Sequence, residues 1–150
     1  MQKIIDKSYV LARLGLGGML FAFGLASLLQ LAPQPQLEGA AAQYMGGLAA
    51  AGYFFPLLKV TEVLVGLALL TNRFVPLALV VLAPITLHIV AFHAALAPAG
   101  IAPGLFILAT HLAVAWERRA AFEGVLQVRP PVASPVAAPA PSRPAIAQAA

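Results

Sequence analysis

Five ionisable side chains lie inside otherwise apolar stretches of this 150-residue chain: Lys59, Glu62, His88, His93 and His111. Lys59 and Glu62 are three residues apart, so on a helix they share one face and can form an ion pair. Histidine exchanges protons near neutral pH and is a common metal ligand. Ionisable side chains are costly inside a membrane, where they usually have a partner or a task. These five residues are therefore the candidate functional residues.

Each of them has a structural and a functional interpretation. Lys59 and Glu62 can pin a bundle as a buried ion pair, His88 and His111 can hydrogen-bond between helices, and His93 can lie at the headgroup level. Alternatively, Glu62, His88 and Lys59 meet in the outer half of the bundle and exchange protons with a quinone headgroup.

Haem between His88 and His111 is disfavoured, because the two residues lie at different depths and paired histidines do not recur on facing helices. The sequence has no hydrolase triad, phosphate-binding loop or metalloprotease motif. Three scattered histidines are the nearest approach to a metal-ligand set, so no metal site is predicted.

The composition indicates a membrane protein. Hydrophobic residues make up 61% of the chain and charged residues only 9%, whereas soluble domains carry roughly a quarter charged residues. The net charge is +4, but the basic residues stand at predicted helix ends and in a tail, so no nucleic-acid partner is expected. Cysteine is absent, which excludes disulfides and cysteine-ligated clusters.

Hydropathy predicts an all-α fold, a bundle of four transmembrane helices. A span takes about 20 mostly apolar residues, and such stretches cover about residues 9–31, 54–71, 74–95 and 103–117. We expect the first helix to be retained, since no signal-peptidase pattern follows it. The weakly hydrophobic residues 37–51 predict a short interfacial helix between helices 1 and 2. Placing the second span at residues 39–58 instead leaves too few residues to return across the membrane.

Basic residues predict the orientation. The residues that flank the spans are Lys3, Lys7, Arg13, Arg73, Arg118 and Arg119, whereas residues 32–53 and 96–102 contain no Lys or Arg. The positive-inside rule then places both termini in the cytoplasm of a multi-pass bacterial inner-membrane protein. Residues 123–150 are rich in Pro and Ala, which predicts a disordered cytoplasmic tail.

Two features concern helix packing. Gly18, Ala22 and Ala26 repeat every four residues in the first span, and Gly66 lies one turn beyond Glu62. Small residues at this spacing let helices approach closely. Pro84, in the middle of the third span, is expected to kink it and to free a backbone carbonyl near Val80.

The central part of the chain resembles the DoxX-like family of small bacterial membrane proteins. The resemblance lies in residues 54–62 (FFPLLKVTE), 66–70 (GLALL), 73–79 (RFVPLAL), 83–85 (API) and 92–93 (FH), and extends over about residues 5–122. It implies a four-helix membrane bundle, and some relatives resemble the quinone-reducing subunit of thiosulfate:quinone oxidoreductase. Lys59, Glu62, Pro84 and His93 match the family pattern. His88 and His111 depart from it, since the pattern leads us to expect Asn and an acidic residue there.

Two hypotheses about function follow. In the first, the chain is an accessory membrane subunit of a redox complex and contacts quinone through its polar cluster. In the second, it is a non-catalytic scaffold or assembly subunit of a larger membrane complex. Both expect the bilayer, and other membrane subunits or further copies of the chain, as partners. A small-solute carrier is disfavoured, because four short helices without repeated halves leave little room for alternating access.

Overall fold

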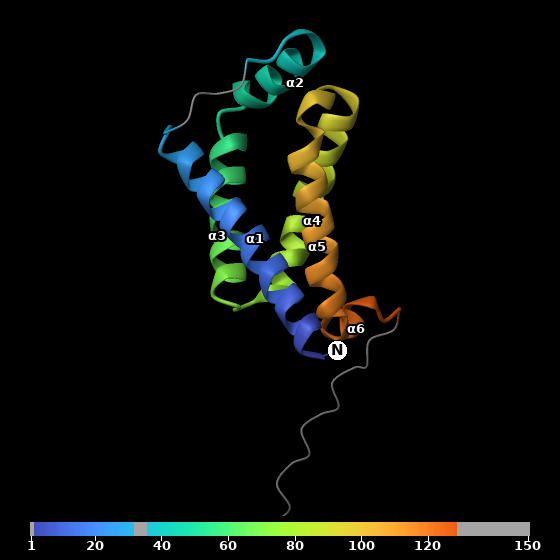
Figure 1. Ribbon diagram of the computed structural model, residues 1–150. Coiled ribbons are helices and arrows are strands. Elements are labelled where there is room, and N and C mark those ends of the chain that lie inside the picture. Colours follow the sequence, from blue (N-terminus) through green and yellow to red (C-terminus); the bar gives the residue numbers. More distant parts are fainter. Residues whose placement is uncertain (1, 32–35, 129–150) are drawn as a thin grey trace, which may run out of the picture.

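The computed structural model describes residues 2–31 and 36–128, and in that part of the chain all regular structure is helical (Figure 1). The four long helices are α1 (Gln2–Leu28), α3 (Phe54–Leu70), α4 (Val75–Ala95) and α5 (Ile101–Glu117). The shorter elements are α2 (Gly39–Ala50), η1 (Pro98–Gly100), η2 (Arg119–Phe122) and α6 (Glu123–Leu126).

Three segments are long and apolar enough to cross a membrane: Lys7–Leu28, Val75–Ala95 and Pro98–Glu117. A fourth candidate is the pair of α2 and α3, which are bent by 89° where they meet. The prediction of an all-helical membrane protein with several apolar helices is therefore confirmed.

Neighbouring long helices run antiparallel. Gly17 of α1 lies against Gly66 and Leu69 of α3, whereas Gly24, two turns later in α1, lies against Lys59 and Glu62. Helix α2 lies across one end of the molecule (Figure 1), which we call the α2 end. The other end brings together the start of α1, the α3–α4 turn and the end of α5, and we call it the basic end.

The α1–α3 interface is closest at glycines. A Cβ atom added to Gly66 would lie 2.6 Å from the backbone N of Phe21 and 2.8 Å from the carbonyl O of Gly17. Gly17 and Gly24 are the matching positions of α1. The stripe predicted from Gly18, Ala22 and Ala26 is a different face: a Cβ atom at Gly18 would meet nothing within 4 Å, and Ala22 is exposed.

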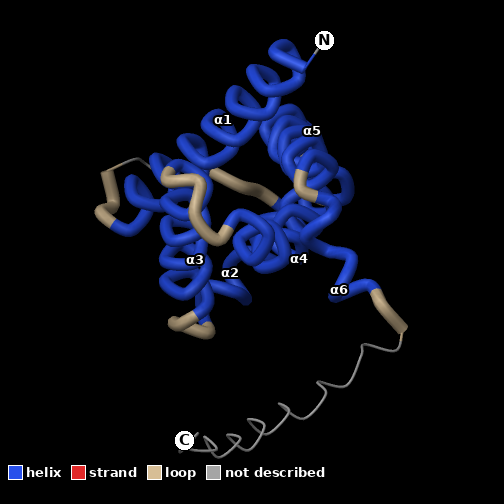
Figure 2. Tube along the Cα trace, turned by 90° about the horizontal axis from the view of Figure 1, so that it is seen from below, coloured by secondary structure: helices blue, strands red, loops and turns tan. Residues whose placement is uncertain are grey.

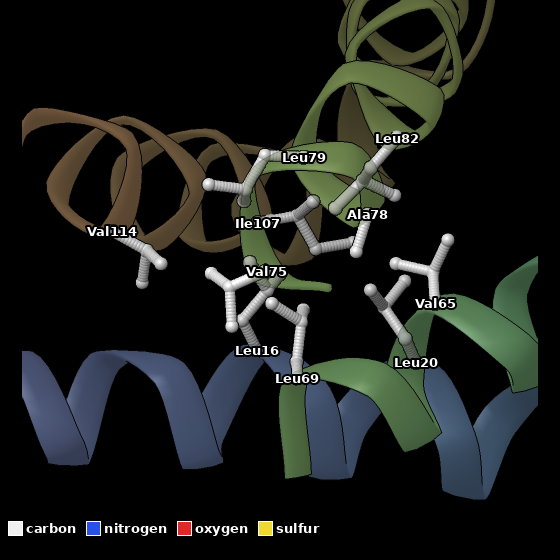
Figure 3. Close-up of a cluster of buried hydrophobic side chains, with 10 residues drawn as sticks. All are labelled: Leu16, Leu20, Val65, Leu69, Val75, Ala78, Leu79, Leu82, Ile107 and Val114. Atoms are coloured by element: carbon white, nitrogen blue, oxygen red, sulfur yellow. The ribbon is translucent and has the colours of Figure 1, made fainter. Parts of the chain in front are cut away.

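The apolar core lies mainly toward the basic end, where side chains of all four long helices interdigitate (Figure 3). It contains Leu16, Leu20, Val65, Leu69, Val75, Ala78, Leu79, Leu82, Ile107 and Val114. Nearer the α2 end, buried positions are small or polar, as at Gly24, Glu62, Thr86 and Gly104. The α2 end therefore depends on specific contacts more than on bulk apolar packing.

Several boundaries differ from those expected. Helix α1 begins at Gln2 rather than near residue 9 and ends at Leu28, because Gln30 takes a left-handed conformation (φ 54°). Helix α5 begins at Ile101, directly after η1, and α4 runs without a break through Pro84. The turns of α6 reach Leu126, four residues into the stretch predicted to be disordered. The rest of that predicted tail, from residue 129 on, lies outside the described residues. Figure 2 views the molecule along its long direction, from the basic end.

Candidate functional site

Lys59 and Glu62 form an ion pair on α3. Lys59 Nζ donates to Glu62 Oε2 at 2.8 Å, and the Glu62 side chain is 6% exposed against 25% for Lys59. The pair lies beside α1, because a Cβ atom at Gly24 would be 3.2 Å from Glu62 Cβ and 3.3 Å from the carbonyl O of Lys59. Gly24 thus makes room for the buried pair, a role that its sequence position did not reveal.

His88 lies against α2. The Tyr44 and His88 rings are stacked, with centroids 5.8 Å apart and an angle of 27° between their planes. The Tyr44 hydroxyl is 3.5 Å from His88 Nε2, a long hydrogen bond, and the Tyr44 ring is 5.9 Å from that of Phe92. Together with Ala91 and Leu96 these residues line an open hollow of about 190 Å³. We call it the α2–α4 hollow.

The structure does not bring Glu62 and His88 together. Glu62 pairs within α3 beside α1, and His88 contacts α2. No hydrogen bond or ion pair joins the two side chains in the described part of the chain. The single polar cluster expected from Lys59, Glu62 and His88 is therefore two separate features.

His111 belongs to a third feature, a polar contact between α4 and α5. Its Nδ1 shares a buried hydrogen bond of 2.9 Å with Thr86 Oγ1. Thr86 and His88 are two residues apart, about 200° around the helix, so His88 faces away from His111. A haem with His88 and His111 as its two ligands does not fit this arrangement. In the described residues, no three His, Asp or Glu side chains are close enough to hold a metal ion.

His93 closes the corner between α4 and η1. Its Nδ1 donates to the carbonyl O of Ala97 at 3.1 Å, since a carbonyl can only accept. A Cβ atom at Gly100 would lie 2.5 Å from His93 Cε1, so the ring packs directly on that glycine. His93 therefore fastens a turn at the α2 end.

A second open cavity, of about 330 Å³, runs between α3 and α4 and is almost entirely apolar. Thr61, Leu64, Val65, Ala68, Phe74, Leu77, Ala78 and Val81 line it. Its one hydroxyl, on Thr61, donates to the carbonyl O of Leu57. We call this cavity the α3–α4 groove.

The hollow and the groove lie along one face of α4. Val81 lines the groove and His88 lines the hollow. They are seven residues apart, so they point in directions about 20° apart and are separated by about 10 Å along the helix axis. Tyr44 completes the hollow from 44 residues away, and no sequence signal identified it as a partner of His88.

Sequence reasoning also missed a network at the basic end. Arg118 Nε donates to the Tyr9 hydroxyl at 2.9 Å, and both Tyr9 and Arg118 donate to Asn72 Oδ1, at 3.1 and 3.2 Å. Arg13, considered above only as a topology signal, is 8% exposed and donates from Nη1 to the carbonyl oxygens of Leu69 and Leu70. It caps the C-terminus of α3, where carbonyl groups lack helical partners.

Comparisons with protein-family models, with curated proteins and with solved structures returned no match.

Proposed function

We propose that this chain is a four-span membrane subunit of a bacterial redox complex that binds a quinone, with the ring in the α2–α4 hollow and the isoprenoid tail in the α3–α4 groove. The single observation that carries the proposal is the placement of an aromatic, histidine-containing hollow and an apolar groove on one face of α4. That order suits a molecule with a flat polar ring and a long apolar chain.

The residues of the hollow suit a quinone ring. Tyr44 and Phe92 offer aromatic faces for stacking. The Tyr44 hydroxyl and His88 Nε2 can each hydrogen-bond a quinone oxygen, and their mutual contact of 3.5 Å is weak enough to be exchanged for one. Reduction of a quinone takes up two electrons and two protons. In this proposal a partner subunit supplies both electrons, His88 relays one proton to a ring oxygen, and the second proton reaches the other oxygen from water.

The four-span arrangement is part of the proposal. Helix α3 has 17 residues, about 26 Å at 1.5 Å per residue, which is short for a hydrocarbon core of about 30 Å. Its antiparallel pairing with α1 supports a full crossing, with α2 at the interface. The positive-inside pattern supports a cytoplasmic basic end. The resemblance to the DoxX-like family supports membership of that family and a location in the bacterial inner membrane.

The test is purification in mild detergent followed by analysis of the bound lipids. We expect quinone to co-purify with the full chain. Tyr44→Phe should lower the retained quinone about five- to tenfold, because it removes one hydrogen bond worth about 1 kcal/mol. Tyr53→Phe is the matched control, since Tyr53 is exposed and lies outside the hollow.

A second arm separates ring binding from tail binding. Val81→Phe narrows the groove without touching the hollow, so it should weaken a long-chain quinone but not an analogue that lacks the tail. A preparation without quinone, or equal losses from Tyr44→Phe and Tyr53→Phe, contradicts the proposal.

A scaffold or assembly role is the second candidate. It is favoured by the fact that Lys59 with Glu62, and Thr86 with His111, already satisfy each other inside the bundle. Groups paired in this way hold helices together and need no ligand. Co-purification of further membrane subunits without quinone would support the scaffold. A stable monomer that keeps its biological activity without partners would reject it.

A further inference from the structure

At the basic end, the described side chains include five basic residues (Lys7, Arg13, Arg73, Arg118 and Arg119) and two acidic ones (Glu117 and Glu123). The guanidinium Cζ atoms of Arg13 and Arg118 lie 5.9 and 4.9 Å from the centroid of the Tyr9 ring. An aromatic face attracts cations but has no net charge. Among the described side chains the one ion pair is Lys59 with Glu62, and it involves neither arginine.

One of these arginines is also incompletely hydrogen-bonded. Arg13 is more than nine-tenths buried, and its Nε has no hydrogen-bond partner among the described residues. A buried guanidinium with an unsatisfied N–H is unfavourable, because its charge is partly removed from water. Arg118 is half-buried and lies over the same ring, so the two positive charges repel each other and attract an anion.

Further cations stand at the same end. Arg73 follows Asn72, whose side chain accepts from both Tyr9 and Arg118, and it is exposed. Lys7 is exposed at the same end, but it lies about 200° around α1 from Tyr9 and faces away from that ring. Arg13, Arg73 and Arg118 come from α1, the α3–α4 turn and the end of α5, so they span three helix ends.

We propose that Arg13 and Arg118, which flank the Tyr9 ring, together with Arg73 of the adjacent turn, bind the phosphate of an anionic phospholipid. Arginine binds phosphate through paired, charge-assisted hydrogen bonds. Basic pockets between transmembrane helices are recognised sites for anionic headgroups, and each added cation near the surface contributes about 1 kcal/mol. The phosphate neutralises the arginines and bridges helix ends that Tyr9 and Asn72 already align. This inference does not rest on the proposed quinone site, whose ring lies in the α2–α4 hollow at the α2 end.

The experiment titrates phosphatidylglycerol into the full-length protein in neutral detergent and follows its melting temperature. We expect a saturable rise with phosphatidylglycerol and none with phosphatidylcholine. In Arg73→Gln the half-saturating concentration should rise about fivefold, which corresponds to the loss of about 1 kcal/mol. Arg73 is exposed, so this variant should melt like the wild type without lipid.

Two controls make the result decisive. Arg143→Gln removes the same unit of charge from a part of the chain outside the described residues, and it should leave the half-saturating concentration unchanged. An equal loss in Arg143→Gln shows general charge attraction and overturns the site. Inorganic phosphate at matched concentration tests the source of the anion. An equal rise with phosphate overturns a lipid ligand, whereas a rise confined to phosphatidylglycerol supports one.

Discussion

At the scale of single residues, the chain holds an ion pair inside an otherwise apolar bundle. Glu62 is the one buried carboxylate among the described side chains, and its partner Lys59 lies one turn away on the same helix. Lys59 is 25% exposed, and its Nζ lies 2.8 Å from Glu62 Oε2. The pair therefore combines a buried acid with a partly exposed base.

The first prediction concerns this pair. Glu62→Gln leaves Lys59 without its counter-charge, and we expect the free energy of unfolding to fall by roughly 2 kcal/mol, below the ~3–5 kcal/mol of fully buried pairs. Replacing both residues, as Lys59→Met with Glu62→Gln, should recover most of the loss because no charge is left unpaired. Thermal unfolding of the purified variants in one detergent measures both effects. A single variant as stable as the wild type contradicts the pairing as a source of stability.

The Lys59–Glu62 pair could be predicted from the sequence, but the partners of His88 and His111 could not. A spacing of three residues on a helix is local information, so Lys59 and Glu62 were expected to meet. The partners of His88 and His111 depend on which helix faces lie against each other. Tyr44 and Thr86 are 44 and 25 residues from their histidines, and in a membrane protein apolar residues on every face hide the orientation of each helix.

At the scale of elements, α1 and α3 form the tightest pair because glycines let their backbones meet. Small residues do lie at this interface, but in α1 they are Gly17 and Gly24, and the stripe of Gly18, Ala22 and Ala26 is on another face. The sequence does not tell which of two adjacent glycines lies at a close helix contact. A stripe of small residues that faces lipid has the same sequence pattern as one that faces another helix. Only the packed structure separates them.

The second prediction tests that interface. Gly66→Ala places a Cβ atom 2.6 Å from the backbone N of Phe21, so α1 and α3 must move apart. We expect a loss of about 1–3 kcal/mol, the usual cost of overpacking. Gly18→Ala is the matched control: it meets no atom within 4 Å and should be neutral or stabilising by up to about 1 kcal/mol through helix propensity. Unfolding of both variants under the same conditions decides the matter, and equal effects would contradict the interface.

At the scale of the whole molecule, the polar network at the basic end constrains how many times the chain passes along the bundle. Hydrogen bonds among Tyr9, Asn72 and Arg118 hold the start of α1, the α3–α4 turn and the end of α5 at one end. Such an arrangement requires an even number of passes along the bundle. Hydropathy alone predicted the four stretches, because segment length and charge are local properties, but it said nothing of this network.

The third prediction tests whether the number of membrane crossings is even. The chain has no cysteine, so single cysteines can be labelled without background. Gly46→Cys in α2 and Gly124→Cys in α6 are both at exposed positions where a Cβ atom meets nothing within 4 Å. With four crossings, a membrane-impermeant maleimide added to spheroplasts should label Gly46→Cys at once and Gly124→Cys only after the membrane is opened. With three crossings, in which α3 does not span, both cysteines would be labelled from outside. Labelling of Gly124→Cys alone would instead reverse the orientation while keeping the four crossings, because α2 and the basic end would still lie on opposite sides.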